Sequence, residues 1–178
     1  VMVVTLLITV SLVLHNGYGL ERAFRSAFFQ VASLHTSCGF GTDDYNMWAP
    51  FTWMLFLYTM VAGGCTGSTS GGVKLMRVVI LLRNVKNEFN RLMHPRAVLP
   101  VKVNGQAVSQ NTLATVGTFV ILYLICAFVG WTLLVFMGLN LEDALGTVLS
   151  SMGNTGPGLG SFGPAFSWNA LPDAAKWV

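Results

Sequence analysis

The feature that most constrains the fold of this chain is the run of residues 109–137, which contains no charged side chain. A helix of that length extends about 40 Å at ~1.5 Å per residue, and with some tilt it crosses a hydrocarbon core about 30 Å thick. Charged residues make up only 10% of the 178 residues, and hydrophobic residues make up 53%. Because a soluble domain carries about 25% charge, the chain is predicted to be a membrane protein in contact with lipid. The same count excludes disordered and nucleic-acid-binding proteins.

The other apolar segments are shorter than a bilayer is thick. Residues 20–34 would form a helix of about 22 Å, and Glu21 suits its first turn. Asn140, followed by Glu142 and Asp143, is typical of an N-cap with acids in the first turn of a second short helix. The sequence therefore predicts half-membrane helices beside complete ones. The other expected helical segments are Val1–Leu14 as the end of a membrane helix, Trp48–Ala62, Val73–Leu82, Leu141–Met152 and a last helix that begins within Phe166–Val178.

The basic residues cluster in the middle of the chain. Seven lie between Lys74 and Lys102 and one acid, Glu88, opposes them, which gives +6; the other three basic and six acidic residues give −3, and the total is the formal +3. Because cytoplasmic loops are rich in Lys and Arg, residues 83–107 are expected in the cytoplasm. A nucleic-acid or lipid patch is the alternative. The alternating pattern around an Asn-Gly pair predicts a hairpin at 101–108. The outer side is expected to hold Asp43, Asp44 and residues 158–164.

The ends of the chain and its cysteines indicate whether the sequence is a fragment, whether it starts with a signal peptide and whether it holds disulfides or zinc. Both ends lie inside apolar runs, so the sequence is expected to be a fragment of a longer chain. The opening run has no basic region before it and no small-residue cleavage site, which argues against a signal peptide. Cys38, Cys65 and Cys126 lie in apolar or Gly-rich surroundings and match neither a disulfide framework nor a zinc site. No bound cofactor is expected.

An internal repeat links the two short helices. Residues 24–41 align with residues 141–158 at an offset of 117 residues (141 minus 24). Each copy is a short helix, then a polar Gly-containing turn, then a returning apolar helix. Because both copies follow an outward-going helix, they are expected to be parallel. We therefore predict an all-α membrane protein in which parallel repeats of membrane helix, half-membrane pore helix, filter loop and membrane helix surround a central pore. The identical positions are Ala27/Ala144, Val31/Val148, Ser33/Ser150, Gly39/Gly156 and Gly41/Gly158.

The polar turns after the short helices carry the predicted chemistry. Non-helical backbone at membrane depth is tolerated only where it is buried or lines a water-filled cavity, and residues 36–41 and 154–158 form such backbone. Its carbonyls can replace the hydration shell of a cation, its glycines permit the required conformations, and the helix C-termini add partial negative charge. The alternative is a pair of tight turns that pack two helical hairpins. The predicted filter residues are Ser37, Cys38, Gly39 and Phe40 in the first copy and Asn154, Thr155, Gly156 and Pro157 in the second.

A Gly-rich segment interrupts the helix that returns from the first turn. In a soluble protein it would be a flexible linker. Val73 stands where a phosphate-binding loop needs lysine, and Thr69 has no acid–base partner that would make it a nucleophile. An intramembrane gate beneath the filter is the favoured hypothesis, because the segment has low intrinsic order and hydroxyls that can meet a passing ion. The segment comprises Gly63, Gly64, Cys65, Thr66, Gly67, Ser68, Thr69, Ser70, Gly71 and Gly72.

Two ionisable residues near the predicted filter have alternative roles. His35 is either a packing and hydrogen-bonding residue, which we favour, or a proton relay. Lys176 either snorkels to the membrane interface or places positive charge near the pore.

Five motifs in order resemble the Trk/Ktr/HKT superfamily of potassium transporters, and most closely its bacterial Trk-type pore subunits. They are residues 36–41, 63–74, 94–98, 154–160 and 171–177, and the resemblance covers essentially the whole chain. It implies four membrane–pore-helix–membrane repeats around one pore, of which this chain is the third and most of the fourth. The third repeat would then be residues 1–82, the cytoplasmic connection 83–108 and the truncated fourth repeat 109–178.

The resemblance also implies site residues and partners. Gly39 and Gly156 match the family's filter glycines, and the backbone oxygens just before them, in residues 37–38 and 154–155, line the ion site. Residues 63–72 match the family's gating loop. The family implies a homodimer and a cytosolic nucleotide-binding regulatory subunit. Two departures are that Cys38 stands where threonine is more usual, and that an arginine of the last helix would lie beyond residue 178.

We therefore expect potassium transport across the bacterial inner membrane, with K⁺ as the transported ion and without chemical catalysis. The residues themselves leave open whether K⁺ is preferred over Na⁺. One alternative is a secondary transporter of another solute with broken helices at its binding site. A membrane-embedded hydrolase is a third class, disfavoured because no nucleophile–base pair is evident.

Overall fold

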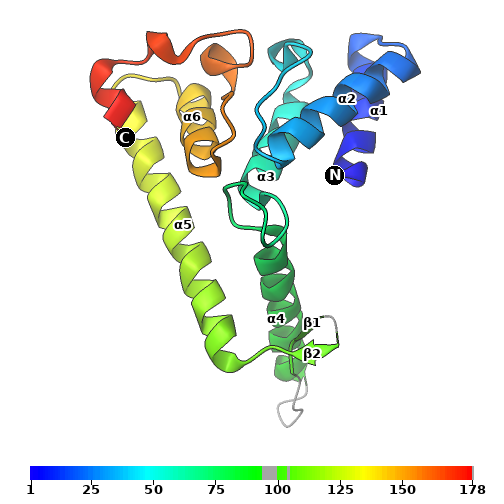
Figure 1. Ribbon diagram of the computed structural model, residues 1–178, viewed down its shortest axis with the longest axis vertical. Helices are drawn as coiled ribbons and strands as arrows, with labels where there is room; N and C mark the ends of the chain where they lie inside the picture. The colour runs from blue at the N-terminus through cyan, green and yellow to red at the C-terminus, as the bar shows by residue number, and fades with distance from the viewer. Residues whose placement is uncertain (94–99, 104, 178) are drawn as a thin grey trace.

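The computed structural model describes residues 1–93, 100–103 and 105–177, which are mostly helical, with irregular loops and one short hairpin. Figure 1 shows two groups of short helices at one end and two long helices, α4 and α5, that descend from them toward the hairpin. The all-α expectation is confirmed. The 94–98 motif with Arg96, and the residues Asn104 and Val178, lie outside the described residues.

The first group contains α1 (Met2–Asn16), α2 (Leu20–His35), the turn η1 (Tyr45–Met47) and α3 (Pro50–Ala62). Gly17 ends α1 in the left-handed conformation, with φ 64°. Pro50 begins α3 at a position where its missing N–H has no helical partner to lose. The helices α2 and α3 have 16 and 13 residues, so each is shorter than a bilayer-spanning helix.

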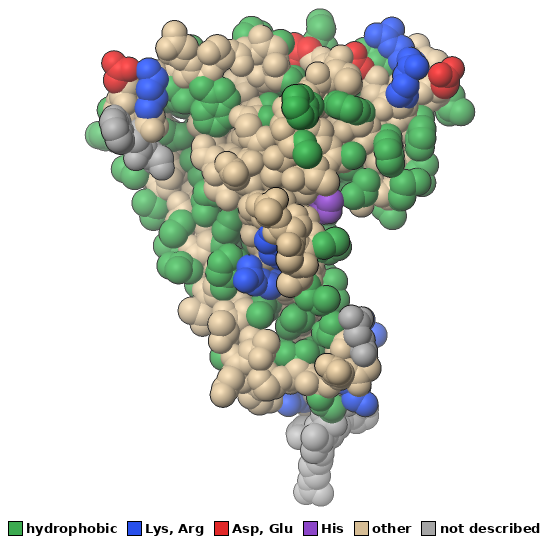
Figure 2. All heavy atoms as spheres, viewed as in Figure 1, with side chains coloured by type: hydrophobic (Ala, Val, Ile, Leu, Met, Phe, Trp, Pro, Cys, Tyr) green, Lys and Arg blue, Asp and Glu red, His purple; other side chains and the backbone are tan. Residues whose placement is uncertain are grey.

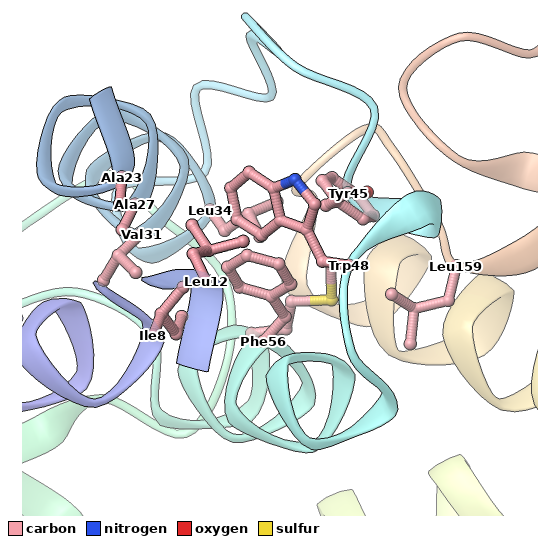
Figure 3. Packing of buried hydrophobic residues seen from close by; sticks show 11 residues of the cluster. Ile8, Leu12, Ala23, Ala27, Val31, Leu34, Tyr45, Trp48, Phe56 and Leu159 are labelled. Carbon is pink, nitrogen blue, oxygen red and sulfur yellow. The ribbon is translucent and has the colours of Figure 1, made fainter. Parts of the chain in front are cut away.

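The core of this group also includes a residue from the second repeat. Figure 3 shows Ala23, Ala27 and Val31 of α2 on one side of the cluster and Leu159 on the other, with Tyr45 and Phe56 between them. Leu159 is 2% exposed. Since a buried aliphatic side chain contributes about 1.5–3 kcal/mol, this insertion fixes the two repeats to each other.

After the Gly-rich segment the chain resumes as α4 (Leu75–Met93). We expected this helix to end near Leu82, but it continues to Met93. The extension has a simple cause: residues 83–93 contain no glycine or proline, and Arg83, Lys86, Glu88 and Arg91 are good helix formers. Ile80 is the one buried residue of α4, and about half of the helix is exposed in the part of the chain that the structure describes.

The predicted hairpin is present as β1 (Lys102–Val103) and β2 (Gln106–Ala107), which pair antiparallel. It leads into α5 (Gln110–Phe136), whose N-cap Ser109 accepts a hydrogen bond from the Thr112 N–H. Within the described residues, α5 is the one helix long and apolar enough to cross a membrane. Its middle exposes large apolar side chains, which suits contact with lipid: Ile121, Leu122, Leu124, Ile125 and Phe128.

The second group is α6 (Leu141–Gly153) and the irregular chain that follows, and α6 lies between α5 and α3 (Figure 1). Asn140 occupies the N-cap position but its side chain makes no capping bond. The carboxylate of Asp143 instead accepts hydrogen bonds from the Ser161 N–H at 3.0 Å and hydroxyl at 2.8 Å. It therefore ties the start of α6 to the chain beyond the second turn.

Residues 166–177 contain no α-helix, and the helix expected to begin within residues 166–178 stays a prediction. The chain there forms two 3₁₀ turns, η3 (Trp168–Ala170) and η4 (Asp173–Trp177), and Pro172, which lacks an N–H donor, lies between them. A further turn, η2 (Gly160–Phe162), precedes them.

Candidate functional site

The two predicted filter loops begin with the same backbone conformation. Ser37 and Asn154, which are 117 residues apart (154 minus 37), are both left-handed, with φ 58° and 51°. Gly39 and Gly156, at the same offset, also have positive φ, 75° and 106°. Only glycine adopts this region without strain, and serine or asparagine occupies it at a cost. The repeat inferred from five identities is therefore present in the backbone itself.

The hydrogen bonds that end the two short helices repeat as well. The Cys38 N–H donates to the Ser33 carbonyl at 2.9 Å, and the Thr155 N–H donates to the Ser150 carbonyl at 2.9 Å. The Ser37 N–H also donates to the Leu34 carbonyl at 3.3 Å, and the Asn154 N–H donates to the Ser151 carbonyl at 3.1 Å. Both helices thus end in the same six-residue capping motif, which points their partly negative C-terminal ends at the loops.

The loops also contact each other directly. The Ser37 hydroxyl donates to the Gly153 carbonyl at 3.0 Å. A Cβ at Gly39 would overlap the Thr155 carbonyl oxygen, whereas a Cβ at Gly156 would meet the Gly39 Cα at 3.8 Å. Gly39 is therefore required both for its φ and for lack of space, and Gly156 for its φ alone.

Side chains in the two loops are not equivalent. Cys38 and Phe40 are exposed, while Thr155 and Pro157 are buried. In the described parts of the chain no cluster of three His, Cys, Asp or Glu side chains could hold a metal ion. The oxygen atoms that the loops offer include those of the backbone carbonyls and of the hydroxyls of Ser37 and Thr155.

The Gly-rich segment is folded around the hydroxyl of Ser70. That hydroxyl accepts hydrogen bonds from the Gly64 N–H at 3.0 Å and from the Ser68 hydroxyl at 2.9 Å, and the Ser70 N–H donates to the Ser68 hydroxyl at 3.1 Å. Ser70 is buried, whereas residues 65–69 are exposed. The segment is thus an ordered loop with an exposed rim, and the expected break between α3 and α4 is present.

Lys74 supplies the charge that closes this loop. Its ammonium donates to the Ser68 carbonyl at 2.7 Å and also to the Ser70 carbonyl. Lys74 itself is left-handed, with φ 72°, a conformation that costs free energy in a non-glycine residue. We counted this charge with the basic block, but its ammonium binds the loop. Figure 2 shows blue side chains half-way along the molecule as well as at its lower end.

The loop approaches the end of α6, directly before the second filter, through its backbone. A Cβ at Gly71 would overlap the carbonyl oxygen of Gly153, the last residue of α6. The same Gly153 carbonyl oxygen accepts the hydrogen bond from the Ser37 hydroxyl. The predicted gate and both predicted filters therefore meet at one peptide group.

Several site residues gave no signal in the sequence. The hydroxyl of Tyr45 donates to the Gly158 carbonyl at 2.5 Å. The side-chain amide of Asn46 donates to the Gly160 carbonyl at 2.9 Å and accepts from the Gly160 N–H at 3.1 Å. These bonds join positions more than a hundred residues apart, so no local pattern could have indicated them. Lys176, for which two roles were open, forms an ion pair with Asp173 at 2.7 Å.

A comparison with protein families places this architecture. The family model described as TrkH, cation transport protein, matches residues 2–178. The chain belongs to the TrkH family of cation transport proteins. The resemblance inferred from the motifs is thus confirmed, and the chain is a membrane protein.

A solved TrkH-family structure agrees with the fold. The crystal structure of the potassium transporter TrkH from Vibrio parahaemolyticus matches with a TM-score of 0.89 and 34% identity, over 99% of this chain and 37% of that one. The Trk system potassium uptake protein TrkH of Escherichia coli K12 is 34% identical over 177 residues, 98% of this chain and 36% of its own length. TrkG of the same strain is 36% identical over 172 residues, 96% and 35% respectively. The chain spans about a third of the length of these relatives.

Proposed function

We propose that this chain forms part of a potassium-conducting pore in the bacterial inner membrane, in which K⁺ passes the backbone carbonyls of residues 37–40 and 154–157. The observation that carries the proposal is one backbone structure repeated in two loops that touch each other. The relatives named as potassium uptake proteins support K⁺ as the ion. The proposal includes no chemical catalysis.

The ion would be stabilised by electrostatics rather than by a formal negative charge. Carbonyl dipoles replace its hydration shell, and the C-terminal ends of α2 and α6 add partial negative charge at the loops. The positive φ of Gly39 and Gly156 changes the direction of successive carbonyls, so that they can face the path of the ion. The pore wall formed here would be completed by repeats outside this chain.

The loop 63–72 is proposed as the gate below this filter. Its exposed rim and its backbone contact with Gly153 support a position on the ion path. The Lys74 ammonium holds the loop in the conformation seen here. Opening would then require that its hydrogen bonds to the loop carbonyls break.

The filter proposal is tested by substitution in the full-length protein. Gly39→Ser and Gly156→Ser should each lower the K⁺/Na⁺ permeability ratio in proteoliposomes, and Gly39→Ser should do so more strongly because its Cβ has no space. Gly17→Ser is the matched control, since Gly17 also has positive φ but no neighbour within 4 Å of a Cβ. Wild-type selectivity in both filter variants would refute the assignment.

We further propose a homodimer and a cytosolic nucleotide-binding regulatory subunit as partners. Support comes from the lower end of the molecule, where Arg83 and Lys86 are exposed on α4 and Arg91 pairs with Glu88 at 3.0 Å. A basic cytoplasmic surface of this kind suits docking of an acidic protein face. It also fits an inner-membrane orientation with this end inside.

A further inference from the structure

The turn η1 of the first repeat makes three hydrogen bonds to the second repeat, all of them just beyond the second filter. Tyr45 binds the Gly158 carbonyl, and Asn46 binds both polar groups of Gly160. The residue between these two glycines, Leu159, is inserted in the core of the first repeat. The stretch 158–160 is therefore held by the neighbouring repeat as well as by its own, in which the Gly158 N–H donates to the Phe162 carbonyl.

The donor side of this contact is rigid. The Tyr45 ring is fully buried and packs against Phe56, with ring centroids 5.1 Å apart. Its carbonyl accepts a hydrogen bond from the Trp53 indole at 3.0 Å. The carboxylate of Asp44 accepts from the Asn46 N–H at 3.0 Å. Burial, and secondarily the charge of Asp44, raises the pKa of Tyr45, so its hydroxyl stays protonated and can donate.

The acceptor side is the downstream end of the second filter. Gly158 follows residues 154–157 directly, and its N–H donates to the Phe162 carbonyl at 2.7 Å. The upstream end is fixed by the bond from Thr155 to Ser150. The filter segment is thus held at both ends, and at the downstream end the Tyr45 hydroxyl supplies one of the two hydrogen bonds to Gly158.

We propose that Tyr45 and Asn46 are positioning residues that set the ion selectivity of the second filter. The inference rests on the proposed potassium pore. The spacing of the carbonyls and their electrostatic field decide for which ion they can replace the hydration shell. A filter segment released at one end would let its carbonyls move closer around a smaller cation. The repeat counterpart of Tyr45 is Phe162 (45 plus 117), which has no hydroxyl and so cannot donate the equivalent bond.

The test is the reversal potential of the full-length protein in planar bilayers with K⁺ on one side and Na⁺ on the other. Tyr45→Phe keeps the ring in the core and removes only the hydroxyl. We expect the K⁺/Na⁺ permeability ratio to fall about fivefold, the equivalent of about 1 kcal/mol, a typical net hydrogen bond. Asn46→Ala should shift the ratio in the same direction.

Tyr123→Phe is the matched control. Tyr123 is 8% exposed, and its hydroxyl has no partner in the described part of the chain, so the ratio should not change. Wild-type ratios in both Tyr45→Phe and Asn46→Ala, with or without reduced flux, would overturn the inference. If Tyr45→Phe is not recovered in the membrane, Asn46→Ala alone decides. An unselective wild-type protein would instead refute the proposed function.

Discussion

At the scale of single residues, the filter glycines could be predicted from sequence, but their different constraints could not. The pattern at Gly39 and Gly156 indicates backbone chemistry at both positions. That Gly39 also lies against the Thr155 carbonyl depends on how two distant loops pack. The role of Lys74 could not be predicted either. Its position in the sequence groups it with other basic residues, whereas its ammonium binds a carbonyl of the Gly-rich loop.

The role of Lys74 gives a prediction at this scale. Lys74→Met removes the ammonium but keeps a long side chain at the same strained φ, so the loop should lose hydrogen bonds worth about 1.5–3 kcal/mol for a charged donor. We expect ⁸⁶Rb⁺ uptake into proteoliposomes to rise about tenfold, with an unchanged K⁺/Na⁺ ratio.

Two further variants sharpen this test. Lys74→Arg keeps a cation that can bind the loop carbonyls, so the uptake rate should stay close to that of the wild type. Lys86→Met removes an exposed charge of α4 and should leave uptake at the wild-type rate. A wild-type uptake rate in Lys74→Met would show that the ammonium does not hold the loop closed.

At the scale of elements, helix positions followed from apolar runs and breakers. The uncharged run became α5, and the short runs became α2, α3 and α6. The end of α4 was predicted too early because hydrophobicity was taken as the guide there. The helix continues through polar residues 83–93, which contain no glycine or proline to end it.

The exposed apolar side chains of α5 give a prediction for an element. Leu124 lies near the middle of the helix and is 56% exposed, so Leu124→Arg should cost about 2.5–3.5 kcal/mol of membrane insertion. The amount of full-length protein in the membrane fraction should fall severalfold. Asn111→Arg, at the exposed start of the same helix, adds the same charge at the interface and should have little effect. Equal losses in the two variants would contradict a membrane-spanning α5.

At the scale of the whole molecule, the charge pattern predicts one orientation. The acidic side chains visible in Figure 2 lie along the upper edge, while α4 and the hairpin carry basic residues at the lower end. Sequence alone indicated this polarity, because topology depends on counting charges. It could not indicate how the repeats lock together, since that depends on Leu159 entering the other repeat's core.

The orientation can be measured with a membrane-impermeant maleimide in a full-length protein whose native cysteines are replaced. Thr42→Cys, near the upper end, should be labelled in intact cells. Lys86→Cys should be labelled only in inside-out vesicles. The reverse pattern would place the basic end outside and contradict the inner-membrane topology. Both positions are exposed in the structure, so access within the chain does not limit the reaction.

The contact between Gly71 and Gly153 has a consequence for how this protein can change. Neither residue has a side chain, so main-chain atoms alone limit how closely the loop approaches α6. One added methyl group at Gly71 would push against the Gly153 carbonyl, which also accepts the hydrogen bond from the Ser37 hydroxyl. A mutation selected there for faster ion flow would therefore alter ion discrimination as well, so speed and accuracy cannot be optimised separately at this position.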